Sequence, residues 1–340
     1  MQAEKSSYIV NIIENTLNNM DERLVGHGKR VAYYVYKILK KQNVYTKKQI
    51  RDICLMAFIH DIGAYKTEEI HNLVAFETGD VWEHSIYGYL FTKHFSPLKH
   101  LAPVLLFHHA DLKELEYMHL SYREITQIIF IADRIDVLSL SEIADWDTFI
   151  DSFYNLGGTV FDTALIDLFF RGEGAIAQED LKLNYPPDFI ETLYSNDFTP
   201  DEVTAYMRMI ILTVEIGSPQ TISGSFAIIK MCEIITDTTG FAEKFCELYS
   251  EKSYDEPLTK ENVMSIMCEM KENGVIDSKF TDLVTECYDV LETGIDAATS
   301  TLDAVYKRVW EEYDLLHSMV YGFKNGLGDH EPYTKKPLAL

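Results

Sequence analysis

Apolar residues recur at the three- and four-residue spacing of amphipathic helices along nearly the whole chain. The first such stripe, Ile9, Ile12, Ile13 and Leu17, predicts an N-terminal helix. Further stripes predict a helix that begins near residue 26, helices over residues 47–59, 83–94, 98–109 and 121–138, and a short helix that ends near 170. Because no segment shows the continuous alternation of a half-buried strand, the sequence predicts an all-α fold.

Turn-forming residues divide this helical pattern. The segments 171–174 and 185–187, rich in glycine and proline, interrupt it, so a domain boundary is expected between them. We therefore predict an N-terminal helix in residues 1–19, a first domain in 20–175, a second helical domain in 186–325 and a flexible tail in 326–340. Gly63 follows the helix of residues 47–59, where a helix end favours a residue that can take a positive φ.

The composition limits the classes of partner. The chain has 340 residues and a formal net charge of −24, which repels nucleic-acid backbones and anionic lipid surfaces, so we expect neither DNA nor a membrane as a partner. Five dispersed cysteines without CxxC spacing are typical of thiols in a reducing cytoplasm. No signal peptide is apparent at the N-terminus, and no apolar run reaches the roughly 20 residues of a membrane span.

Histidines gather in the first third of the chain, where nine of the eleven lie between residues 27 and 119. Several stand at predicted helix ends or beside carboxylates. Imidazole and carboxylate groups hold divalent ions such as Mn, Fe or Zn, and facing helices of a bundle can bring them together. The candidate metal ligands are His27, His60, Asp61, His84, His108, His109 and Asp133.

Each candidate also has a purely structural interpretation. A lone helical histidine is more often packed or solvated, and two adjacent histidines point about 100° apart on a helix, so one of His108 and His109 would be structural. Asp133 follows an apolar run, where a buried carboxylate is costly unless it is paired or metal-bound. Arg134 beside it is the alternative partner. We prefer the metal hypothesis, because otherwise a separate structural explanation would have to hold for every one of these residues at once.

The order of these residues resembles the HD superfamily, specifically the HD-GYP branch of cyclic di-GMP phosphodiesterases. The resemblance covers about residues 20–170. It rests on the HxxR-Val start at 27–31, the HDIG motif at 60–63, the later histidines at 84, 108 and 109, the Ala-Asp-x-x-Asp element at 132–136, and Gly158, Phe161 and Asp162.

The resemblance implies a dinuclear centre. His27, His60, Asp61 and Asp133 would hold one ion, and Asp61 would bridge to a second ion held by His84, His108 and His109. Fe or Mn is favoured, with Zn, Ni or Mg as alternatives. Arg23 replaces the glutamate that binds a third ion in some members, so two ions are expected. We assign catalytic roles to Asp61, Lys66 and Arg30.

Two departures from the family concern the substrate. Ala64 stands where HDIG is usually followed by lysine, and Lys66 is a candidate replacement. In the family, a glutamate and then a loop containing Gly-Tyr-Pro follow the histidine doublet. Neither follows His109 here, and we consider Asp111 as a substitute carboxylate. We therefore expect a phosphohydrolase whose substrate is a nucleotide phosphoester, foremost a cyclic dinucleotide such as cyclic di-GMP. The alternatives are a nucleotide phosphomonoesterase and a catalytically silent sensor that keeps the metal site.

The second half carries fewer signals. Residues 217–225 resemble the start of an HD unit in which Gly224 replaces histidine, and residues 258–283 resemble its end. A degenerate, metal-free HD-like domain and an unrelated helical bundle are both open. The apolar stripe between residues 296 and 321 predicts a long helix that either mediates a homodimer or packs within the chain.

Overall fold

The computed structural model describes residues 3–18, 25–66, 82–117, 120–139, 145–182, 184–194, 198–215 and 260–273, with residues 285, 288–289, 293, 304–305 and 307–320. The predicted all-α class is confirmed, because the elements in these ranges are α-helices and short 3-10 helices, and no strand occurs among them. An isolated bridge joins Gly157 and Phe161. The proposed HD-like repeat at 217–283 falls largely outside the described residues, as does the predicted tail at 326–340.

The chain divides into two compact units. One comprises residues 1–213 together with 312–340, and the other comprises residues 214–311. The second unit includes helix α14 (Lys260–Glu272), in which Val263 and Met267 are buried. The domain limits expected from the sequence, 20–175 and 186–325, remain a prediction.

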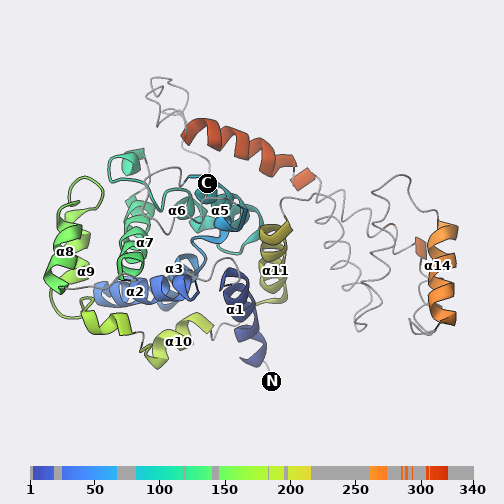
Figure 1. Cartoon of the computed structure of the whole chain (residues 1–340), viewed down its shortest axis with the longest axis horizontal. Helices are drawn as coiled ribbons and strands as arrows, with labels where there is room; N and C mark the ends of the chain where they lie inside the picture. The colour runs from blue at the N-terminus through green and yellow to red at the C-terminus, as the bar shows by residue number, and fades with distance from the viewer. Residues whose placement is uncertain are drawn as a thin grey trace. The chain divides into compact units, whose positions relative to one another are not determined.

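Five helices form the centre of the first unit. Helix α2 (His27–Gln42) packs against α3 (Lys47–Phe58) and α7 (Leu120–Ser139), and α5 (Trp82–Phe95) packs against α6 (Ala102–Leu106), as Figure 1 shows. A capping box between Thr46 and Gln49 starts α3. At Gly28 a Cβ would lie 2.2 Å from the carbonyl oxygen of Phe58, so only glycine lets α2 approach the end of α3.

Further helices surround this centre. They are α1 (Ala3–Asn18), α8 (Trp146–Tyr154), α9 (Thr163–Phe170), α10 (Pro187–Tyr194) and α11 (Pro200–Glu215), with the 3-10 helices η2 (Ile62–Lys66), η3 (Lys99–Leu101), η4 (Glu114–Tyr117) and η5 (Gln178–Lys182). Side chains of Asp145 and Asp162 cap the first turns of α8 and α9. The described helices include none with the length and apolarity that crossing a bilayer requires.

The C-terminal segment 312–320 is helical and packs on α5. Glu312 accepts hydrogen bonds from His94, Lys93 and the Tyr89 hydroxyl. Further along the segment, Tyr313 donates to Glu83 Oε1 over 3.1 Å. Val320 is buried in an apolar cluster with Trp82, Ala110 and Leu115. These contacts lie within the chain, whereas a homodimer through the same region remains a prediction.

Two expectations about local structure were wrong. The predicted helix over 98–109 is a 3-10 turn followed by α6, which ends at Leu106, so the histidine doublet lies in the turn after the helix. Gly63 is not among the glycines with positive φ. Glycine is required there because a Cβ would lie 1.9 Å from the carbonyl oxygen of His84, where α5 crosses directly over η2.

Candidate metal centre

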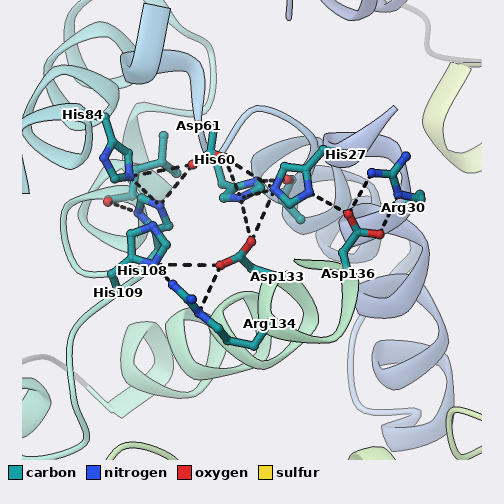
Figure 2. A network of polar contacts seen from close by, with 12 residues as sticks. His27, Arg30, His60, Asp61, His84, His108, His109, Asp133, Arg134 and Asp136 are labelled. Carbon is teal, nitrogen blue, oxygen red and sulfur yellow. Dashed lines mark hydrogen bonds and ion pairs between the residues drawn. The ribbon is translucent and has the colours of Figure 1, made fainter. Parts of the chain in front are cut away.

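The seven predicted ligands come together in the first unit as two adjoining groups (Figure 2). One group consists of His27, His60 and Asp133, and the other of Asp61, His84, His108 and His109. Within each group the possible ligand atoms lie within 4.8 Å of one another. All seven side chains are buried or nearly so, although the residues are spread over 107 positions of sequence from 27 to 133.

The ends of helices supply most of these side chains. His27 is the first residue of α2, the pair His60-Asp61 lies in the turn after α3, and His84 lies in the first turn of α5. His108 and His109 follow α6. Since the doublet lies outside regular helix, the 100° separation expected on a helix does not apply, and both rings face the same site (Figure 2).

Hydrogen bonds hold three of the imidazoles in one orientation. The Nδ1 atoms of His60 and His108 lie 2.8 Å and 2.6 Å from the carbonyl oxygens of Ala57 and Leu105. A carbonyl only accepts, so both Nδ1 atoms carry a hydrogen that they donate. His27 likewise directs Nδ1 to the Asp136 carboxylate over 2.7 Å. In each ring Nε2 is left to face the site, as in histidines that ligate metals.

The inward-facing atoms explain why a cation fits between them. Nε2 of His27 lies 3.3 Å from Nε2 of His60, and Nε2 of His84 lies 3.3 Å from Nε2 of His108. When the rings are neutral with hydrogen on Nδ1, the Nε2 lone pairs of His27 and His60 oppose each other, which a shared cation relieves. Asp61 Oδ1 is also buried without a hydrogen bond among the described residues. The donor set therefore fits divalent metal ions.

Asp61 faces both groups through different oxygen atoms. Its Oδ2 lies 3.4 Å from Nε2 of His27 and 3.4 Å from Nε2 of His60. Its Oδ1 lies 3.5 Å from Nε2 of His108 and 3.7 Å from Nε2 of His84. Each oxygen atom of Asp61 thus faces a different set of imidazoles, and its role as a bridging carboxylate remains a prediction.

Burial and charge act in opposite directions on these groups. Burial alone lowers the pKa of His27, but hydrogen bonds to three carboxylates outweigh it and raise that pKa well above its usual value. Burial lowers the pKa of His108 and, with two neighbouring imidazoles, takes that of His109 well below its usual value. Burial raises the pKa of a carboxyl, yet the surrounding histidines hold those of Asp61 and Asp133 well below the usual range.

Asp136 contacts the candidate site, although the sequence assigned no role to it. It is fully buried one turn after Asp133 on α7, and it holds His27 Nδ1. Nε and Nη2 of Arg30 donate to the same carboxylate over 2.6 Å and 2.9 Å. The motif at 132–136 contained this aspartate, but only tertiary contacts reveal that it orients a candidate ligand.

The other residues that the sequence analysis singled out near the site are Arg30, Lys66, Ala64, Asp111 and Arg134. Besides its bonds to Asp136, Arg30 donates from Nη1 to the Val25 carbonyl oxygen over 2.7 Å. The side chain of Lys66 lies outside the described part of the chain. Ala64 is fully buried, and Asp111 is exposed at the end of the turn after α6. Arg134, considered from the sequence as the partner of Asp133, has Nε 3.7 Å from Asp133 Oδ2.

Comparisons with known proteins give one partial match. The 3'3'-cGAMP-specific phosphodiesterase 1 of Vibrio cholerae is 25% identical over 129 residues, which make up 37% of this chain and 30% of the relative. The match thus spans less than a third of that protein's length. No family model matches the chain, and no solved structure matches it.

Proposed function

We propose that this chain is a metal-dependent phosphodiesterase that hydrolyses a cyclic dinucleotide, with cyclic di-GMP and 3'3'-cGAMP as the first candidates. The proposal is carried by one observation, the two buried groups of imidazole and carboxylate donors that share Asp61. The partial similarity to a phosphodiesterase of a cyclic dinucleotide supports the same reaction class. The motifs likewise favoured a cyclic dinucleotide, with cyclic di-GMP as the example, and the relative adds 3'3'-cGAMP as a second candidate.

Two divalent ions in such a centre supply the positive charge that stabilises phosphate oxygens and that makes a water molecule acidic enough to act near neutral pH. The chain's own residues position this charge. Asp61 joins the two donor groups, while the hydrogen bonds at Nδ1 of His27, His60 and His108 keep the opposite nitrogen directed inward. Burial excludes bulk water, which strengthens every electrostatic interaction at the phosphate.

The test combines metal analysis with product analysis. Protein purified without oxygen is expected to hold close to two ions per chain and to convert a cyclic dinucleotide into its linear form. Asp61→Asn should lower both metal content and turnover, because it removes the charge that faces both groups. Asp52→Asn is the matched control. Asp52 lies on α3 and is buried like Asp61, but it accepts hydrogen bonds from Arg51, away from the cluster.

The outcomes separate the alternatives. Orthophosphate released from mononucleotides, without attack on cyclic dinucleotides, would replace the proposal by a phosphomonoesterase. Bound metal without hydrolysis of any phosphoester would replace it by a sensor. Metal content near zero in the wild-type protein would refute the metal centre itself.

A further inference from the structure

Arg134 lies at the edge of the metal centre (Figure 2). It follows the ligand Asp133 on α7, and its guanidinium carbon lies 5.4 Å from the centroid of the Phe130 ring. Nη2 is 3.4 Å from Nδ1 of His109, and the side chain keeps 20% of its surface exposed. A permanent positive charge thus stands in contact with a candidate metal ligand and with solvent.

The contact with His109 differs from those of the other imidazoles. His60 and His108 donate from Nδ1 to backbone carbonyl oxygens, whereas His109 directs Nδ1 at a group that has only donors. His109 Nδ1 must therefore accept the hydrogen bond from Arg134. A neutral imidazole that accepts at Nδ1 carries its hydrogen on Nε2, and Nε2 of His109 is buried without a hydrogen bond among the described residues.

This arrangement is incompatible with metal ligation by His109. An ion on Nδ1 would occupy the lone pair that Arg134 uses. With an ion on Nε2, the hydrogen of the neutral ring moves to Nδ1, where it would oppose the N–H of Arg134. In either case the hydrogen bond between Arg134 and His109 is lost when an ion binds, and the added positive charge also repels the guanidinium.

We propose that metal loading releases Arg134 from His109 and makes it the residue that binds the phosphate of the substrate. The inference rests on the proposed function for the choice of a phosphodiester as ligand. Guanidinium binds phosphate through two parallel hydrogen bonds, and Arg134 is already beside the metal ligands. Arg30, the other arginine at the cluster, has its three nitrogen atoms bonded to Asp136 and to the Val25 carbonyl oxygen. The remaining carboxylates there repel an anion, so the guanidinium of Arg134, which also pairs with Asp133 over 3.7 Å, supplies the positive charge that they lack.

The experiment measures binding of inorganic phosphate to the manganese-loaded full chain by calorimetry, and binding of Mn²⁺ alone by titration. Arg134→Met should weaken phosphate binding by about 10- to 100-fold, as expected for loss of a charged hydrogen bond. Arg134→Lys, which keeps the charge, should fall between this variant and wild type. Mn²⁺ affinity of Arg134→Met should equal or exceed that of wild type, since a competing contact is removed. Arg171→Met is the matched control, because Arg171 is 69% exposed and pairs with Asp167.

Several results would overturn the inference. Phosphate affinity that is unchanged in Arg134→Met, or absent in wild type, would exclude Arg134 as the phosphate ligand. A loss of Mn²⁺ affinity in Arg134→Met, with the lysine variant restoring it, would mean that Arg134 supports His109 in the loaded state. If phosphate binding depends on Arg134 but no phosphodiester is hydrolysed, the proposed function fails and the anion site stands. If wild type and Arg134→Met hydrolyse a cyclic dinucleotide equally, the proposed function stands and the phosphate-binding role of Arg134 is refuted.

Discussion

Replacing Asp136 by asparagine tests how the centre is oriented. The side chain is fully buried, and its two oxygen atoms accept from His27 Nδ1 at 2.7 Å and from Arg30 at 2.6 Å and 2.9 Å. Asparagine keeps the shape but replaces one acceptor oxygen by an NH2 donor. That donor would face a donor of His27 or Arg30, so at least one charge-assisted bond is lost.

The magnitude follows from these contacts. One lost hydrogen bond to a charged group is worth about 1.5–3 kcal/mol, and the partly uncompensated Arg30 adds to it, so the free energy of unfolding should fall by about 2–4 kcal/mol. Because His27 is no longer held with Nε2 facing inward, metal affinity should fall about 10- to 100-fold, as for other residues that orient metal-binding histidines.

The assay is a metal titration beside chemical denaturation with and without the ion. Asp180→Asn is the control, because Asp180 also pairs with a cation and a second donor of α2, Lys37 and Tyr33, but touches no candidate ligand. The control should lose stability while its metal affinity stays that of wild type. If folded Asp136→Asn binds metal as tightly as wild type, the orienting role of Asp136 is refuted.

Three further predictions concern packing, pH and metal removal. Gly63→Ala should lower the free energy of unfolding by about 1–3 kcal/mol and reduce metal content, because its Cβ would meet the carbonyl oxygen of His84. Unfolding at the wild-type denaturant concentration would contradict this. Burial raises the pKa of Glu312, but bonds to His94 and Lys93 outweigh it and lower that pKa to about 2. Since the folded pKa is below the ordinary value of 4.5, this stabilisation is present above pH 4.5 and is lost as the pH falls towards 2. Glu312→Gln should abolish the loss of stability between pH 4.5 and 2 that Glu312 causes, as measured by denaturation across this range. Chelation should lower the melting temperature of the wild type, because the ions bind the folded chain, whereas an unchanged temperature would indicate that none were bound.

Much of the candidate metal centre could be predicted from the sequence, because its residues are chemically unusual in their positions. Histidines at helix ends and Asp133 within an apolar run are costly or uncommon unless something binds them. The glycines beside them were also visible, yet the reason given for Gly63 was wrong. A helix end explains a glycine locally, whereas the approach of α5 to η2 is a contact between Gly63 and His84, which lie 21 positions apart in the sequence.

The sequence alone determined the helical class, through periodicity, and the set of metal-ligand candidates, through residue type and order. Tertiary structure decided how these residues act together. It sorted the ligands into two groups on opposite oxygens of Asp61, paired Asp136 with His27, and set Arg134 against His109. Such assignments depend on which ring nitrogen faces which atom across different helices. Residue order carries no information on that geometry, because it arises only when the helices pack.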